Sequence, residues 1–203
     1  MRTYILGNSI VRGLEDPSWT TIRISGANWE TLLSYVNNNQ RRFSNSIIYF
    51  HIGPVRFSQM NSSRRCSLVT NSNVEPDSFF NPYFETFYNN RIHIILCTIY
   101  PLDFQKYNGV FDSRNADFTC RIRSMVVSEN RRIVGFNMSL GFATPYMHKR
   151  IFTRRHGTYS FRDRFLRDGL HPKNLILRDW IEELKRVQRI NLHRVIRRAE
   201  RAR

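Results

Sequence analysis

Short runs of apolar residues along the chain indicate buried strands. One run covers Tyr4–Gly7 and a second covers Thr21–Ser25. Two further runs, Ser46–Ile52 (SIIYFHI) and His93–Tyr100 (HIILCTIY), consist almost entirely of β-branched and aromatic residues. Nearly continuous apolar strands are typical of a parallel sheet that is covered on both faces. We therefore predict that these four runs form the centre of one parallel sheet.

Between these runs, apolar side chains recur at the spacing of helices. In Asn28–Val36 the apolar residues fall on one helical face, and Asn28 can serve as the N-cap. The other predicted elements are helices over Asp77–Asn89 and Asn115–Val127, a short fifth strand over Arg132–Asn137 (RIVGFN), and a final helix from about Asn174 toward Arg203. Strands that alternate with helices predict an α/β fold, a three-layer doubly wound sheet of about five mainly parallel strands.

Two stretches lack this order. Residues 56–75 are rich in Ser, Asn and Arg and predict a long loop, and residues 138–167 predict a long irregular connection. The 203 residues suit one core of ordinary size. We expect residues 1–190 to form this domain and residues 191–203 to be a basic extension of its last helix.

The net charge is the property of this sequence that differs most from the average for globular proteins. The chain has 32 Lys and Arg against 16 Asp and Glu, a formal net charge of +16. Such a surplus attracts polyanions such as nucleic acid or acidic lipid. Because no zinc-finger, RRM or KH motif is recognisable, we expect electrostatic, salt-dependent binding of RNA or DNA. The predicted contact residues on the last helix are Arg194, Arg197, Arg198 and Arg201.

Cysteine usage and hydropathy bound the remaining possibilities. Cys66, Cys97 and Cys120 form no CxxC pair, so we predict no disulfide framework and no zinc site. We also expect no other metal and no cofactor. A reduced intracellular setting, cytoplasm or nucleus, fits best. The sequence contains no run of about 18 apolar residues, and we predict neither a signal peptide nor a membrane span.

Three short pieces carry candidate chemistry. Ser9 follows the first predicted strand, Gly26 follows the second, and Asp168 stands three residues before His171 in a turn that contains glycine. Loops that leave the carboxyl ends of parallel strands meet at one edge of the sheet. There the Asp168 carboxylate can orient the imidazole of His171, whose second nitrogen faces Ser9. This arrangement is typical of acyl transfer, with a serine nucleophile and a histidine base.

These pieces resemble the conserved blocks of the SGNH (GDSL) ester hydrolases. In that family the first block is usually Gly-Asp-Ser, the second carries a glycine, the third is Gly-x-Asn-Asp and the last is Asp-x-x-His. This chain has Gly7-Asn8-Ser9, Gly26 and Asp168-Gly-Leu-His171 in the corresponding places. The resemblance covers nearly the whole chain. It implies a flavodoxin-like sheet, a catalytic triad of Ser9, Asp168 and His171, and an oxyanion hole formed by the N–H groups of Ser9 and Gly26.

The third block departs from the family pattern. It reads Gly53-Pro54-Val55-Arg56, so Val55 stands where the asparagine of the oxyanion hole is expected. A valine side chain donates no hydrogen bond, and one donor is missing unless a loop residue such as Asn61 supplies it.

A narrower resemblance is to the SGNH-type domains in open reading frames of some retrotransposons. The segments that carry it are Arg132–Asn137, Thr144–His148, Arg154–Gly157 and Asp168–Pro172.

Two functions therefore remain open. The first is a serine ester hydrolase that works through an acyl-enzyme, with Ser9 as nucleophile, His171 as base and Asp168 as its partner, on an ester that the sequence does not define. The second is a non-catalytic SGNH-fold module that binds nucleic acid for a mobile element or virus. The three triad residue types favour the enzyme, whereas the missing asparagine favours the module.

Overall fold

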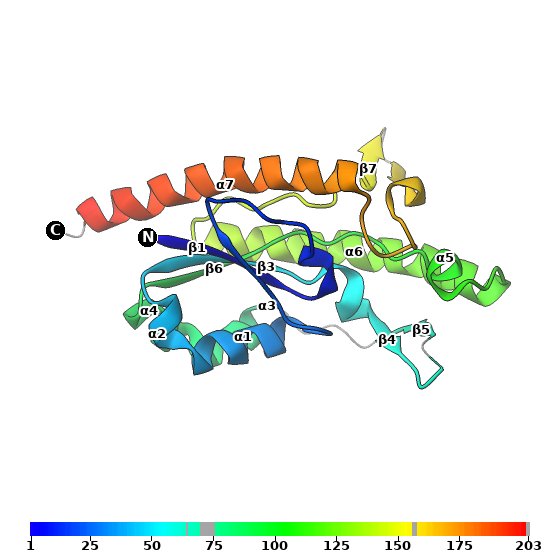
Figure 1. The fold of residues 1–203 in the computed structure, drawn as a ribbon, viewed down its shortest axis with the longest axis horizontal. Coiled ribbons are helices and arrows are strands. Elements are labelled where there is room, and N and C mark those ends of the chain that lie inside the picture. Colours follow the sequence, from blue (N-terminus) through cyan, green and yellow to red (C-terminus); the bar gives the residue numbers. More distant parts are fainter. Residues whose placement is uncertain (64, 70–75, 156–157, 202–203) are drawn as a thin grey trace.

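The structure, a computed structural model, describes residues 1–63, 65–69, 76–155 and 158–201. Its centre is a parallel sheet with the strand order β2-β1-β3-β6 (Figure 1). The strands are β1 (Arg2–Gly7), β2 (Thr20–Arg23), β3 (Ser46–His51) and β6 (Ile92–Leu96). The prediction of an α/β fold with a parallel sheet is confirmed. In the described part of the chain this sheet has four strands, not about five.

Helices and two hairpins complete the domain. The α-helices are α1 (Trp29–Asn38), α2 (Gln40–Phe43), α3 (Pro76–Phe80), α4 (Phe84–Asn89), α5 (Phe104–Asn108), α6 (Ser113–Ser139) and α7 (Asn174–Arg201). Short 3-10 turns are η1 (Ser9–Val11), η2 (Gly53–Phe57), η3 (Asn81–Tyr83) and η4 (Asp163–Phe165). The hairpins pair β4 (Ser58–Met60) with β5 (Cys66–Leu68), and β7 (Phe152–Arg155) with β8 (Thr158–Phe161).

The side chains of β3 show how the layers are arranged. All six are buried, and successive residues point to opposite faces of the sheet. The ring of His51 lies 4.8 Å from that of Trp180 in α7. On the other face, the ring of Phe50 lies 6.4 Å from that of Phe80 in α3. The sheet is therefore the middle of three layers, with α7 on one side and α1 to α4 on the other (Figure 1).

The first helix forms where the sequence predicts it. Asn28 caps α1 by accepting a hydrogen bond from the Thr31 N–H at 2.9 Å. The buried residues Trp29, Leu32, Leu33 and Val36 form one face of the helix. This prediction is confirmed.

The predicted fifth strand at Arg132–Asn137 is wrong, because these residues belong to the 27-residue helix α6. A short apolar run by itself does not distinguish a strand from a buried helix. The buried residues Ile122, Val126, Ile133 and Phe136 recur at helical spacing. No proline interrupts the segment, and the helix continues through it.

Two asparagines of α6 cover the open edge of β6 and of the chain that follows it. Asn137 accepts a hydrogen bond from the Leu96 N–H at 3.0 Å and donates one to the Leu96 carbonyl at 2.8 Å. Asn130 makes the same pair of bonds with Ile99, both at 2.8 Å. The two asparagines are two helical turns apart, so their amides point from the same face. They take the place of a neighbouring strand.

Three further segments differ from their predicted secondary structure. The predicted loop at 56–75 contains the β4–β5 hairpin, and its residues 64 and 70–75 lie outside the described part. The helix predicted over Asp77–Asn89 is divided into α3, η3 and α4, with Pro82 in the 3-10 turn. The connection at 138–167 contains the β7–β8 hairpin, whose residues 156–157 are not described.

The last helix begins at Asn174, as predicted, and runs to Arg201 without a break at residue 190. Past that point it still packs on the domain. Asn191 accepts a hydrogen bond from the Ala143 N–H at 2.7 Å and donates one to the Ala143 carbonyl at 3.0 Å. Residues 202–203 lie outside the described part. None of the described helices is both long and apolar enough to span a membrane.

Candidate active site

Ser9 lies at the carboxyl edge of the sheet, in the turn that follows β1. Asn8 fixes this turn, because its side chain accepts from the Ile10 N–H at 3.0 Å and donates to the Ile52 carbonyl at 2.6 Å. At Gly7, a Cβ atom would overlap the carbonyl oxygen of His51. The first block is thus tied to the loop after β3, and Ser9 begins η1 next to it.

Asp168 and His171 meet Ser9 from the other end of the chain. His171 Nδ1 lies 2.8 Å from Asp168 Oδ2, and His171 Nε2 lies 3.0 Å from the Ser9 hydroxyl. Ser9 and His171 are 162 positions apart in the sequence. The structure therefore brings the three residues into one hydrogen-bonded chain, in the order that general-base activation of a serine requires.

The second oxygen of Asp168 holds the turn that carries the histidine. Asp168 Oδ1 accepts hydrogen bonds from the N–H groups of Leu170 at 3.1 Å and His171 at 2.7 Å. Partial burial alone would raise the pKa of Asp168. The hydrogen bonds from the backbone and imidazole of His171 and from Leu170 outweigh it, so the pKa lies below its ordinary value. Asp168 is consequently ionised at neutral pH.

The turn at 168–171 is also fixed from outside. Gly169 has φ +85, and a Cβ atom there would lie 2.6 Å from the carbonyl oxygen of Asp103. The Asp103 N–H donates to the Gly169 carbonyl at 3.0 Å, and the Tyr100 hydroxyl donates to the Leu170 carbonyl at 2.8 Å. No local pattern in the sequence points to Tyr100 and Asp103, because their partners are about 70 positions away.

A pocket of about 740 Å³ opens beside Ser9. Ser9 and Gly26, the two residues predicted to supply oxyanion donors, both line it. Gly26 has φ +67, a backbone conformation that favours glycine. The rest of the lining is mainly apolar and includes Trp29, Ile52, Met60, Phe79, Leu102 and Leu170. The site can therefore receive a substrate with a sizeable apolar group.

The third block, residues 53–56, lies at the same edge of the sheet, but Asn61 does not supply the third oxyanion donor there. Val55 falls within η2, and its side chain is outside the described part. Asn61 lies in the β4–β5 hairpin, where its side chain accepts from the Arg65 N–H at 2.8 Å, and it does not line the pocket. Gln59 and Arg56 do line the pocket. Both side chains carry N–H donors, and neither was expected from the sequence to act as one.

Arg56 is held tightly in the pocket wall. Its guanidinium carbon lies 4.5 Å from the ring centroid of Trp29 and 5.2 Å from that of Phe79. Its Nε lies 3.1 Å from Glu129 Oε1, and the two side chains are 8% and 1% exposed. A buried cation with two aromatic faces and a carboxylate partner is held in one geometry. Nothing in the local sequence signals this pair, since Glu129 comes from α6.

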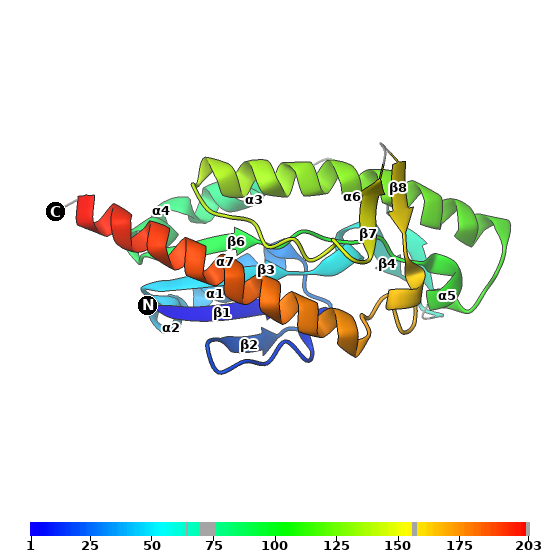
Figure 2. The same cartoon turned by 90° about the horizontal axis from the view of Figure 1, so that it is seen from above.

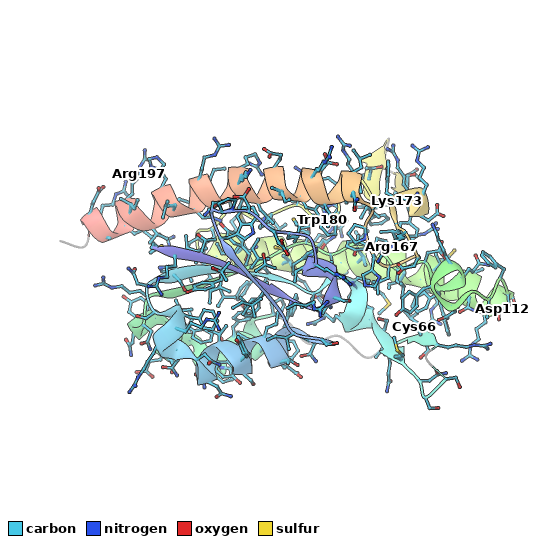
Figure 3. The ribbon with its side chains drawn as sticks, viewed as in Figure 1. Cys66, Asp112, Arg167, Lys173, Trp180 and Arg197 are labelled. Atoms are coloured by element: carbon cyan, nitrogen blue, oxygen red, sulfur yellow. The ribbon has the colours of Figure 1, made fainter. Side chains whose placement is uncertain are left out.

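The four arginines predicted to bind nucleic acid divide into two pairs. Arg194 donates to the Gly141 carbonyl at 3.2 Å, and Arg198 donates to the Leu140 carbonyl at 2.9 Å. They bind carbonyls just beyond the end of α6, where cations are favourable. Arg197 and Arg201 are exposed on α7. Figure 3 shows Arg197 near the C-terminal end of α7, whereas Arg167 and Lys173 lie near the other end of that helix.

No set of three or more His, Cys, Asp and Glu side chains in the described ranges is arranged to hold a metal ion. The three cysteines are free thiols. Cys66 and Cys97 are buried, and burial raises the pKa of both. Cys120 is exposed on α6.

The fold is similar to solved structures of lipolytic hydrolases. A predicted acylhydrolase from Bacteroides fragilis matches with a TM-score of 0.60 and 14% identity, over 96% of this chain and 87% of that protein. A GDSL-like lipase from Bacteroides thetaiotaomicron matches with a TM-score of 0.59 and 17% identity, over 98% and 88%. The chain therefore has the fold of the GDSL/SGNH hydrolases.

A third similar structure is the OSK domain of Drosophila Oskar, with a TM-score of 0.53 and 13% identity, over 90% of this chain and 86% of that one. No protein-family model matches the sequence, and a search of curated proteins found no significant match. At these identities the likeness concerns the fold alone.

Proposed function

We propose that this protein is a serine ester hydrolase of SGNH type that works through an acyl-enzyme. The observation that carries the proposal is the hydrogen-bonded chain from Ser9 Oγ through the His171 ring to Asp168, with distances of 3.0 and 2.8 Å. Its position at the carboxyl edge of a parallel sheet, beside a large pocket, is where α/β enzymes bind substrates.

Ser9, His171 and Asp168 then each have a defined role in the reaction. Ser9 Oγ attacks the ester carbonyl carbon while His171 Nε2 takes its proton, and Asp168 stabilises the imidazolium. The tetrahedral intermediate collapses, and the departing alkoxide takes the proton from His171. A water molecule, deprotonated by His171, attacks the acyl-serine. The acid is released, and Ser9 regains its proton.

The backbone N–H groups of Ser9 and Gly26 are the proposed oxyanion donors. In well-studied hydrolases one such donor is worth about 3 kcal/mol of transition-state stabilisation. Because Val55 donates nothing through its side chain, we assign the third donor to the pocket residues Gln59 or Arg56. This assignment predicts that Gln59→Leu or Arg56→Met lowers turnover.

A fluorophosphonate probe tests the proposal directly, because it labels only an activated serine. We expect the wild-type protein to be labelled, and Ser9→Ala and His171→Ala to show no labelling. Ser18→Ala is a matched control, since Ser18 is an exposed serine in the loop before β2. The absence of labelling in a folded wild-type protein would refute a catalytic role.

A second candidate function is association with nucleic acid, and the net charge of +16 is the observation that favours it. The exposed Arg197 and Arg201 are proposed contacts. Arg194 and Arg198 keep their charge while they bind the end of α6, so they add to the positive potential there. This function predicts salt-dependent binding that Ser9→Ala leaves intact, whereas the hydrolase predicts loss of labelling in that variant.

A further inference from the structure

A groove separate from the pocket at Ser9 lies between α6 and the β7–β8 hairpin. Its volume is about 300 Å³. Its lining residues are Val127, Asn130, Arg131, Val134, Tyr146, His148, Phe152 and Tyr159. None of them lines the pocket at Ser9. Figure 2 shows the hairpin beside α6, on the side of the molecule where α7 begins.

Flat rings form much of this groove. Tyr159 stacks on the buried Phe152, with ring centroids 5.1 Å apart and an interplanar angle of 18°. Across from the hairpin, Tyr146 packs edge-on against His148 at 6.0 Å. Burial lowers the pKa of His148 to about 4, and its Nδ1 lies 2.9 Å from the Thr98 hydroxyl. The imidazole is therefore neutral at physiological pH and adds another aromatic face.

Cations sit on or beside these rings. Lys149 Nζ lies 4.3 Å from the ring centroid of Tyr146, and the guanidinium carbon of Arg154 lies 5.6 Å from that of Tyr159. Arg131 lines the groove from α6, and its side chain is exposed. Lys149 and Arg154 are also exposed. The groove thus has one exposed cation in its lining, Arg131, and two more, Lys149 and Arg154, over the rings of Tyr146 and Tyr159.

The surrounding charge is mainly positive. Residues 121–167 contain eleven Arg and Lys but only two Asp and Glu. One of the two acids is Glu129, which is 1% exposed and paired with Arg56. Three acidic residues of α7 line a hollow together with Tyr146. Asp179 and Glu183 are paired with Arg150 and Arg186 at 2.9 and 2.8 Å, and the exposed Glu182 lies 3.6 Å from Lys185. This face attracts anions.

We propose that this groove binds single-stranded nucleic acid, with bases stacked on Tyr146 and Tyr159 and phosphates contacting Arg131, Lys149 and Arg154. Alternation of aromatic faces with cations is how proteins hold single strands without reading their sequence. The volume is at the lower end for ligand sites, so one planar base fits it. In a duplex the base faces are already stacked and cannot enter. The inference rests on the second candidate function and gives it a site.

Fluorescence anisotropy with a labelled oligouridine of about twelve nucleotides tests the inference, since known single-strand sites span a similar length. A hairpin duplex of equal charge and long-chain polyphosphate serve as competitors. Tyr146→Leu and Tyr159→Leu remove ring faces but keep apolar bulk. Arg131→Gln/Arg154→Gln removes one charge that lines the groove and one that lies over the Tyr159 ring, and Arg41→Gln/Arg178→Gln removes two exposed charges elsewhere.

We expect each tyrosine variant to weaken binding about tenfold, since stacking contributes about that much per base. The groove arginine pair should lower the slope of log K against log salt by about 1.4, or about 0.7 per phosphate contact, and the control pair should change it less. All variants should react with the fluorophosphonate probe as the wild type does.

Three results would overturn the inference. Tyrosine variants that bind like the wild type would exclude stacking in this groove. Duplex or polyphosphate that competes as well as the single strand would show that binding depends on charge alone. An equal decrease of the salt slope in the groove arginine pair and the control pair would show that the groove arginines make no phosphate contact of their own. In these cases association with polyanions still stands. A wild-type protein that binds no oligonucleotide at low salt would refute the second function as well.

Discussion

The substitution Asp168→Asn separates the role of the carboxylate in catalysis from its role in holding the turn. An asparagine has an oxygen that can still accept from the N–H groups of Leu170 and His171, at the present 3.1 and 2.7 Å. Its amide nitrogen, in place of Oδ2, would donate to His171 Nδ1 across the present 2.8 Å. The variant therefore keeps the turn but moves the proton of the neutral imidazole from Nδ1 to Nε2.

The expected loss follows from this reversal. With Nδ1 accepting, the neutral ring carries its proton on Nε2, the atom 3.0 Å from the Ser9 hydroxyl. That nitrogen then has no lone pair to take the serine proton. In serine hydrolases a tautomer inverted in this way lowers the rate about 10⁴-fold, or about 5.5 kcal/mol of activation free energy.

The rate of fluorophosphonate labelling measures this loss without knowledge of the natural ester. The rate constants of the wild type and Asp168→Asn are compared near pH 7. The thermal midpoint, expected to stay within a few degrees, confirms that the turn is intact. If the folded Asp168→Asn variant is labelled with a rate constant within tenfold of the wild-type value, Asp168 does not set the tautomer of His171.

Three further predictions concern stability. Gly169→Ala forces a left-handed φ on alanine and places its Cβ 2.6 Å from the carbonyl oxygen of Asp103, so we expect a loss of about 2 kcal/mol or more in chemical denaturation; an unchanged midpoint would contradict this. Burial lowers the pKa of His51 from 6.5 to about 3. The free energy of unfolding is therefore not reduced by this residue above about pH 6.5, and it falls as the pH drops toward 3. By pH 5 the cost is about 2 kcal/mol, and His51→Phe should flatten that part of a stability–pH curve. Asn137→Ala leaves two buried backbone groups without partners and should cost about 2 to 5 kcal/mol; a loss under 1 kcal/mol in urea unfolding would show that water replaces the amide.

Much of the fold could be predicted from the sequence because local signals agreed with the tertiary structure. The strands at Arg2–Gly7 and Ser46–His51 are apolar enough to be buried on both faces, and Asn28 marks the start of α1. Arg132–Asn137 failed because strand and helix propensities do not decide a short apolar run. The unbroken helical pattern from Ser113 onward was the signal that could have decided it.

The β7–β8 hairpin was missed although the sequence offers a cue. Phe152–Arg155 and Thr158–Phe161 are rich in β-formers and flank a short segment that contains Gly157. By contrast, the contacts of Arg56 with Glu129 and of Tyr100 with Leu170 join residues far apart in the chain. No local pattern reveals such pairs. The elements of the candidate site were therefore visible in the sequence, but most of what fixes their geometry was not.

The way α6 seals the sheet has a consequence for solubility. An edge strand whose backbone groups are unpaired is a template on which another chain can add a strand, and proteins usually protect it with extra strands, charges or bulges. Here two amides, those of Asn130 and Asn137, provide that protection for residues 96–99. A substitution at either asparagine therefore leaves a backbone N–H and C=O of a buried residue unpaired, and another chain can pair with them only where α6 moves away from this edge.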